Sequence, residues 1–155
     1  MLTYSLYAQD FSDPTPPPPY STSIGLGAEI SSNSREGVAA GGVLSFGIDL
    51  NQQFALGLKA SFSLDADSVS TLEPRVFARY YLPLKITGLF AQAELGAALI
   101  FEDSKLYPAF SGGIAAGWRY YLYKNLYIEP AVRAGYPFIW GLSLTAGWRF
   151  NGESQ

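Results

Sequence analysis

Apolar residues recur at every second position over most of this chain, from Ile24 to Phe150. A period of two is typical of β-strands, and no window of the chain shows the period of three to four residues that an amphipathic helix requires. Short polar turns divide the pattern into segments. Eight strands are predicted, at residues 24–30, 38–48, 54–64, 72–82, 89–101, 110–122, 126–136 and 140–150.

The alternating pattern gives the predicted sheet two unlike faces. One face is aliphatic and aromatic, and the other combines Gly, Ala and Ser with all the charged residues of the strands. These charges are four acids and six bases: Glu29, Lys59, Glu73, Arg75, Arg79, Glu94, Arg119, Glu129, Arg133 and Arg149. A soluble barrel would enclose the apolar face, whereas a membrane barrel would turn it to lipid.

The aromatic residues of the apolar face favour the membrane arrangement, because they gather at the strand ends. One rim would carry Tyr80, Trp118, Tyr120, Trp148 and Phe150, and the other Phe62, Phe101, Phe110, Tyr136 and Trp140. Two aromatic girdles of this kind mark the membrane interfaces of transmembrane barrels. A soluble core has no reason to sort its aromatics into two rims.

The small residues of the other face point the same way, because the interior of an eight-stranded barrel has room only for small side chains and a few long ones. Pro130 lies on the apolar face without a charged residue beside it, which suits a closed barrel that has no edge to protect. The fold class predicted is all-β: an eight-stranded antiparallel up-and-down transmembrane β-barrel over residues 20–150.

Composition narrows the function. The 155 residues suffice for one domain, the net charge is −3 and no run of Lys or Arg occurs, so nucleic acid is excluded as a partner. The chain has neither His nor Cys, so the commonest general base and the thiolate metal ligands are missing. We therefore predict no enzymatic activity, no cofactor and no metal site.

Two pairs of loop carboxylates are the remaining metal candidates. Asp65 with Asp67, and Glu102 with Asp103, could offer oxygen ligands to Ca²⁺, but neither pair stands in a calcium-binding loop motif. Solvated loop charges are the preferred interpretation.

The two ends of the chain lie outside the alternating pattern. Residues 1–19 are interpreted as a signal remnant and a Pro-rich periplasmic tail, with a disordered leader as the alternative for the first eight residues. Pro16–Pro19 favours an extended polyproline II shape, which is either a plain spacer or a dock for a periplasmic partner. Residues 151–155 are expected to be a C-terminal tail.

Three segments carry a resemblance to a known family. Residues 78–82 (ARYYL) and 117–122 (GWRYYL) repeat one aromatic strand end, and residues 141–150 (GLSLTAGWRF) end in alternating aromatics. On these residues the chain resembles the OmpA/OmpX-like class of eight-stranded outer-membrane β-barrels across residues 20–150. It departs from the class at Thr145, where Gly is frequent, and in the five residues that follow Phe150.

The resemblance implies a protein of the bacterial outer membrane that lies in its lipid bilayer and is inserted by the barrel assembly machinery. Both termini would face the periplasm, with the turns at 49–53, 82–88 and 123–125. Short outer loops would lie at 31–37, 65–71, 102–107 and 136–139. The enzymes of this architecture, palmitoyltransferase, deacylase and omptin-like protease barrels, need a His that this chain lacks.

The function expected is structural: support of envelope integrity or anchoring of partners, with the interior charges joined in a salt-bridged plug because unpaired buried charges are costly. Two alternatives stay open. The excess of two bases over acids among the strand charges favours a minor pore for ions or small solutes, and the reverse orientation of the sheet would give a soluble lipocalin-like carrier of an apolar ligand.

Overall fold

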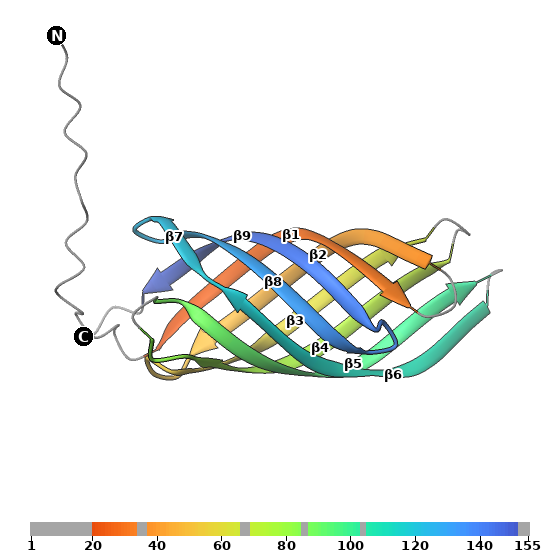
Figure 1. Cartoon of the computed structure of the whole chain (residues 1–155), viewed down its shortest axis with the longest axis horizontal. Coiled ribbons are helices and arrows are strands. Elements are labelled where there is room, and N and C mark those ends of the chain that lie inside the picture. Colours follow the sequence, from red (N-terminus) through yellow and green to blue (C-terminus); the bar gives the residue numbers. More distant parts are fainter. Residues whose placement is uncertain (1–19, 34–36, 66–68, 85–86, 103–104, 152–155) are drawn as a thin grey trace, which may run out of the picture.

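The computed structural model describes residues 20–33, 37–65, 69–84, 87–102 and 105–151. They form one closed antiparallel sheet (Figure 1). Its strands are β1 Ser21–Asn33, β2 Gly37–Asp49, β3 Phe54–Leu64, β4 Ser70–Tyr81, β5 Leu89–Glu102, β6 Lys105–Trp118, β7 Tyr120–Tyr123, β8 Leu126–Tyr136 and β9 Trp140–Asn151. Each strand pairs with its neighbour in sequence, except that β6 and β7 both pair with β8, and the β1–β9 ladder completes the ring.

β6 and β7 are one strand with a local interruption at Arg119. The pairs Gly117–Ala131 and Tyr120–Ile128 lie on either side of the interruption in the same register. Pro130 lies opposite the gap and has no N–H, so it cannot supply the ladder hydrogen bond there. The barrel therefore has eight strands, and the predicted fold class is confirmed.

We call the end where β1 begins and β9 finishes the terminal end, and the opposite end the loop end (left and right in Figure 1). At the loop end the strands run further than the alternation predicted. Residues 31–33 belong to β1, residues 70–71 to β4, and residues 102 and 105–107 to the β5–β6 hairpin, so the outer loops predicted there are shorter still. At these strand ends most of the residues are polar, so the alternation of apolar residues does not mark them as strand.

One stretch of β6 has a neighbour on one side only. β6 pairs with β5 along its whole length, but with β8 only over Gly112–Gly117. Residues 105–111 thus form an exposed sheet edge on the β5–β6 hairpin, which reaches far along the loop end (Figure 1). Pro108 interrupts the donors of this edge and Lys105 adds a charge, and both features discourage pairing with another chain.

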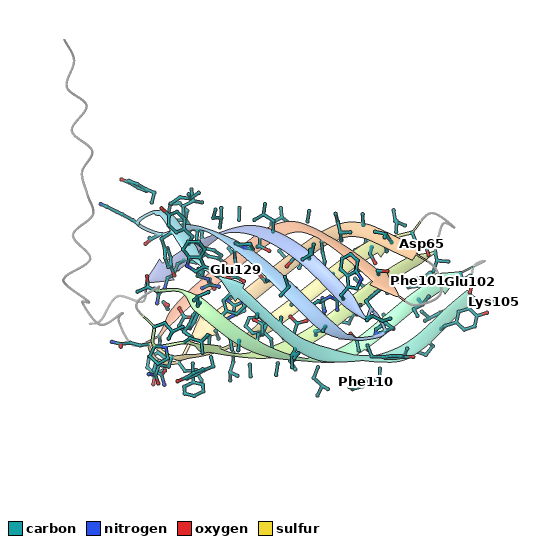
Figure 2. The ribbon with its side chains drawn as sticks, in the orientation of Figure 1. Asp65, Phe101, Glu102, Lys105, Phe110 and Glu129 are labelled. Carbon is teal, nitrogen blue, oxygen red and sulfur yellow. The ribbon has the colours of Figure 1, made fainter. Side chains whose placement is uncertain are left out.

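The barrel exposes its apolar face and buries its charges. Leu56, Leu95 and Leu144 are 48%, 55% and 59% exposed, whereas Arg79 and Glu129 are 5% and 8% exposed. Figure 2 shows aliphatic side chains standing off the outer surface of the sheet. This orientation rules out the soluble lipocalin-like carrier, in which the leucines would surround a central cavity. The described residues form no helix with the length and hydropathy that crossing a membrane requires.

The interior also holds aromatic rings, which the sequence pattern did not predict. Phe77, Phe90 and Tyr127 point inward and are almost fully buried. Each lies directly opposite a glycine of the neighbouring strand, at positions 57, 117 and 147. A Cβ at Gly57 would come within 2.3 Å of the Phe77 ring, and one at Gly147 within 2.3 Å of the Tyr127 ring. These glycines are therefore small because the rings occupy the space.

Candidate functional site: the charged lumen and its two ends

All ten charged strand residues singled out in the sequence lie on the inward face. Glu29, Glu73, Arg75, Arg79, Glu94, Arg119 and Glu129 are buried, and Lys59, Arg133 and Arg149 have side chains that are 10%, 8% and 18% exposed. The structure does not bring them together as one group. They form three contact groups along the axis of the barrel, with a glutamine joining two of them.

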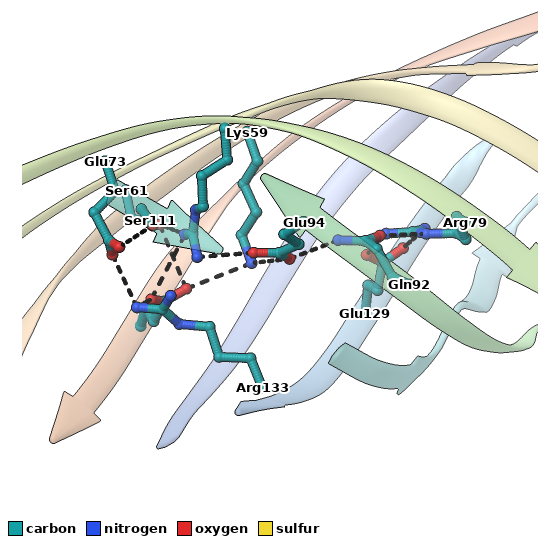
Figure 3. Close-up of polar contacts among 11 residues, drawn as sticks. Lys59, Ser61, Glu73, Arg79, Gln92, Glu94, Ser111, Glu129 and Arg133 are labelled. Atoms are coloured by element: carbon teal, nitrogen blue, oxygen red, sulfur yellow. Dashed lines mark hydrogen bonds and ion pairs between the residues drawn. The ribbon is translucent and has the colours of Figure 1, made fainter. Parts of the chain in front are cut away.

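The central cluster balances three carboxylates with three cations: Glu29, Glu73, Glu94, Lys59, Arg75 and Arg133 (Figure 3). Arg133 Nη2 lies 2.9 Å from Glu73 Oε2 and 3.0 Å from Glu29 Oε1. Lys59 Nζ lies 3.5 Å from a carboxylate oxygen of both Glu29 and Glu94. Ser111 donates to Glu73 at 2.7 Å, and Arg75 donates to Ser61. The cluster joins β1, β3, β4, β5, β6 and β8 across the lumen.

The second group is an Arg79–Glu129–Arg119 triad nearer the terminal end. Arg79 donates to both oxygens of Glu129, at 2.7 and 2.8 Å, and Arg119 Nε donates to one of them at 2.8 Å. Gln92 accepts from Arg79 Nε at 2.8 Å and donates to Glu94 at 2.6 Å, so it links the triad to the central cluster. The Arg79 guanidinium also stacks 3.8 Å from the Phe90 ring centre.

The third group contains a partner that the sequence analysis missed. Arg149 Nη2 lies 3.0 Å from Asp49 Oδ2, and Ser21 bridges the two by accepting from Arg149 and donating to Asp49, both at 2.7 Å. Asp49 was assigned to a turn, although its odd position shares the inward parity of β2. With Asp49 included, the ion pairs among the described residues join six cations and five carboxylates, so the excess of two bases counted in the sequence falls to one.

The interior offers more hydrogen-bond donors than acceptors. Arg75 Nη1 lies 2.7 Å from Glu94 Oε2 without the alignment of a hydrogen bond. Arg75 Nε, Arg119 Nη1 and Arg133 Nε are buried and have no partner among the described residues. Because buried polar groups normally find a partner, these donors indicate a surplus of positive hydrogen-bonding groups in the lumen.

At the loop end the β8–β9 turn folds inward. The turn was predicted as an outer loop at 136–139, but Tyr136 belongs to β8 and Phe138 is only 5% exposed. The Ile139 N–H donates to the Ser32 carbonyl of β1 at 2.9 Å, which ties the turn to the neighbouring strand at the rim. A void of about 40 Å³ remains beside Phe138, and one of about 20 Å³ lies in the middle of the lumen.

At the terminal end the barrel opens into a larger cavity, which we call the vestibule. Its volume is about 280 Å³, and the inward-facing side chains that line it are Asp49, Tyr81, Arg119, Tyr121 and Arg149. The β2–β3 and β4–β5 turns form its lip, with Asn51, Gln52, Gln53 and Leu84 exposed. The interior is thus closed at one end and hollow at the other.

The aromatic residues predicted as girdles lie outward near the strand ends. At the terminal end, Trp118 donates to the Thr87 carbonyl at 2.8 Å, its ring lies 5.3 Å from that of Tyr120, and Tyr80 lies 5.0 Å from Phe54, which the sequence analysis did not include in the girdle. The other predicted members are also exposed: Trp148 and Phe150 at the same end, and Phe62, Phe101, Phe110, Tyr136 and Trp140 toward the loop end.

The carboxylate pairs considered for Ca²⁺ are only partly described. Asp65 and Glu102 lie at the ends of different hairpins (Figure 2), while Asp67 and Asp103 fall outside the described residues. Among the described residues no three acidic side chains are grouped to hold a metal ion. The predicted tail at residues 1–19 lies outside the described residues, as does most of the tail predicted at 151–155, but Asn151 belongs to β9, where it pairs with Ser21.

A closed barrel with an apolar exterior and a charged interior is the arrangement of a transmembrane β-barrel. The fold is similar to that of OprG, an outer membrane protein from Pseudomonas aeruginosa, with a TM-score of 0.64, 12% identity and coverage of 88% of this chain and 98% of that one. It is also similar to Neisserial surface protein A, with a TM-score of 0.55, 16% identity and coverage of 86% and 96%.

A third similar structure is Ail, the attachment invasion locus protein of Yersinia pestis, with a TM-score of 0.56, 14% identity and coverage of 85% and 99%. No protein-family model and no curated protein sequence matches the chain. The identities are low, so the likeness concerns the fold: the chain has the fold of the outer-membrane β-barrels, as the OmpA/OmpX-like resemblance implied. The predicted location in the bacterial outer membrane agrees with these neighbours.

Proposed function

We propose that the chain is a plugged barrel of the bacterial outer membrane that supports envelope integrity or anchors partners, and that it is neither an enzyme nor an open pore. The observation that carries this proposal is the ion-pair network across the lumen. Six cations and five carboxylates contact one another over three groups, from Arg133 near the loop end to Arg149 near the terminal end.

The voids of the lumen support a plug over a pore. The described residues leave about 20 Å³ in the middle and about 40 Å³ beneath Phe138, which are separate cavities with different linings. A void of about 10–15 Å³ on this measure holds one water, so these voids suit a few waters and not an ion with its hydration shell. The smaller excess of positive charge also weakens the argument that favoured a pore in the sequence.

A non-enzymatic role is supported by the chemistry of the side chains. The chain has no His or Cys, and its buried carboxylates are engaged by arginine or lysine. A carboxylate held in this way is a poor proton acceptor. We also propose no cofactor, because the chain has no His or Cys and its buried carboxylates are already engaged.

Conductance tests the plug. The refolded protein is added to planar bilayers beside a Glu129→Gln variant, and heat-modifiable gel migration verifies that both are folded. Background conductance is expected for both proteins, because the removal of one carboxylate does not create a continuous path. Stable channel openings in the wild type would overturn the plugged-barrel proposal.

Insertion and orientation are part of the proposal. The closing strand β9, with Trp148 and Phe150 at its end, is the segment offered to the barrel assembly machinery, and the terminal end faces the periplasm. The Pro-rich tail would then reach a periplasmic partner or act as a spacer. Because the chain has no Cys, Lys105→Cys and Gln52→Cys give single labelling sites at opposite ends. In intact cells a membrane-impermeant maleimide should label only the first.

A further inference from the structure

The vestibule is built unlike the rest of the lumen. The central cluster fills its space and balances its charges three against three, whereas the vestibule keeps about 280 Å³ open beside the two remaining groups. These groups contain the cations Arg79, Arg119 and Arg149 and the carboxylates Asp49 and Glu129. Among the three ion-paired groups, the one cation in excess of the carboxylates therefore belongs to the half of the barrel that contains the vestibule.

The arginine and tyrosine side chains in the vestibule wall present hydrogen-bond donors. Tyr81 Oη accepts from Arg79 Nη1 at 3.3 Å, and Tyr121 Oη accepts from Arg149 Nη1 at 3.4 Å. A phenol oxygen that accepts from a guanidinium still has its own O–H to donate. Arg119, in the same wall, has a second buried donor, Nη1, without a partner among the described residues.

The one carboxylate among the described residues of the wall is already engaged. Oδ2 of Asp49 is contacted by Arg149 and Ser21. Asn51 Oδ1 in the lip accepts from the backbone N–H groups of Gln53 and Phe54, both at 2.8 Å. A cation entering the vestibule would meet the positive charge of Arg119 and Arg149, whereas an oxyanion would meet their guanidinium groups and the two tyrosine hydroxyls.

We propose that the vestibule binds a compact oxyanion, the phosphate or carboxylate group of a ligand that enters from the terminal end. Arg149 and the Tyr121 hydroxyl hold the group at one wall, and the Tyr81 hydroxyl with the positive field of Arg119 acts from the floor. Charge-assisted hydrogen bonds from guanidinium groups to such anions are among the strongest that side chains make. Asp49 limits the affinity, because it repels the ligand while it positions Arg149.

Titration with inorganic phosphate tests the site directly. The full chain is folded in a non-ionic detergent at neutral pH, and the arginine Nε–H signals are followed by ¹H–¹⁵N NMR spectroscopy. Saturable shifts are expected at Arg149 and Arg119. No change is expected at Arg133, which lies nearer the loop end of the barrel. Equal shifts at all three arginines, or none that saturates, would overturn the proposal.

Three variants assign the contacts. Arg149→Gln should weaken phosphate binding by tenfold or more, and Tyr121→Phe by about three- to tenfold, because one charged and one neutral donor are lost. Asp49→Asn should tighten binding. Weaker phosphate binding in Asp49→Asn would show that the carboxylate does not repel the ligand, and it would refute the proposal. Because Arg149→Gln removes a lumen contact, its folding is verified by gel migration. If Arg149→Gln does not fold, the phosphate affinity of Tyr121→Phe alone tests the site.

A matched control separates the site from general attraction. Lys124 is exposed in the β7–β8 turn at the same end of the barrel and lies outside the vestibule wall. Lys124→Gln removes the same charge as Arg149→Gln and should leave phosphate affinity within twofold of the wild type. If Lys124→Gln and Arg149→Gln weaken binding equally, the anion responds to net charge and the site is refuted.

The source of the anion is resolved by competition. Dihexanoyl phosphatidylglycerol added to the phosphate-bound protein displaces phosphate from the Arg149 and Arg119 signals if a lipid headgroup reaches the vestibule. If it does not, while phosphate still binds, the ligand is a free anion. Both results support the site, and neither depends on whether the barrel conducts ions.

Discussion

Glu129 gives the sharpest test of the lumen network, because one carboxylate separates two buried arginines. It accepts three hydrogen bonds of 2.7–2.8 Å, two from Arg79 and one from Arg119, and it is 8% exposed. Glu129→Gln keeps the size of the side chain and one acceptor oxygen but leaves the two guanidinium groups facing each other without a counter-charge.

Removal of one member of a buried ion pair costs about 3–5 kcal/mol. We expect about 3 kcal/mol for Glu129→Gln, because Gln92 still accepts from Arg79 and the aromatic rings beside both arginines remain. With an m-value of about 1–3 kcal/mol/M in urea, the unfolding midpoint in lipid vesicles should fall by about 1–3 M. Equilibrium unfolding followed by tryptophan fluorescence measures this shift.

Two further variants interpret the result. Glu102→Gln removes a carboxylate exposed at the loop end and should change stability by less than about 0.5 kcal/mol. Adding Arg119→Gln to Glu129→Gln should restore part of the loss, because one of the two facing cations disappears. If Glu129→Gln lies within about 1 kcal/mol of the wild type, the lumen screens charge as water does and the reasoning fails.

Three other changes test the exterior, the packing and the free edge. Leu95→Arg in the middle of β5 should destabilise the barrel in vesicles by about 2–4 kcal/mol, and Leu122→Arg near the terminal end by about 0–1 kcal/mol, in the same urea assay. Gly57→Ala should cost about 1–3 kcal/mol because its Cβ would lie 2.2 Å from the Phe46 carbonyl oxygen and 2.3 Å from the Phe77 ring, whereas Gly47→Ala meets nothing closer than a serine hydroxyl at 3.0 Å and should cost less. Pro108→Thr restores an N–H to the exposed edge of β6 and should increase self-association in detergent, measured by cross-linking.

The fold could be predicted from the sequence because lipid imposes a simple pattern on a barrel. A side chain on the outer surface meets hydrocarbon and its neighbour meets the lumen, so polarity must alternate along every strand. The parity of Leu56 and Leu95 thus fixed which face is exposed, and the parity of Arg79 and Glu129 fixed which face is buried. The strand ends escaped prediction because polar residues such as Glu102 and Lys105 pair in the ladder outside the apolar band.

The ion-pair partners could not be predicted to the same extent, because they depend on register. Arg79 and Glu129 are 50 residues apart and lie on strands that the barrel places across the lumen. Alternation assigns both residues to the interior, but it does not show that they form an ion pair with each other. The Asp49–Arg149 pair was missed because Asp49 follows the last apolar residue of its strand, where a turn signal and an inward parity coincide. Inward aromatics such as Tyr127 were missed because only the opposite glycine makes room for them.

The distribution of charge along the lumen connects the plug with the vestibule. The central cluster is neutral, so it needs no further partner, and the Arg79–Glu129–Arg119 triad carries one positive charge that the Asp49–Arg149 pair does not cancel. Unbalanced buried charge is costly, and in this half of the barrel the open volume is available to an anion. A ligand that binds only the folded barrel stabilises it by mass action, with about 1.4 kcal/mol gained at ten times its dissociation constant. Phosphate should therefore raise the unfolding midpoint of the wild type more than that of Tyr121→Phe, in which three- to tenfold weaker binding leaves about 0.4–0.9 kcal/mol of stabilisation at the same concentration. Equal increases in both proteins would assign the effect to salt rather than to the vestibule.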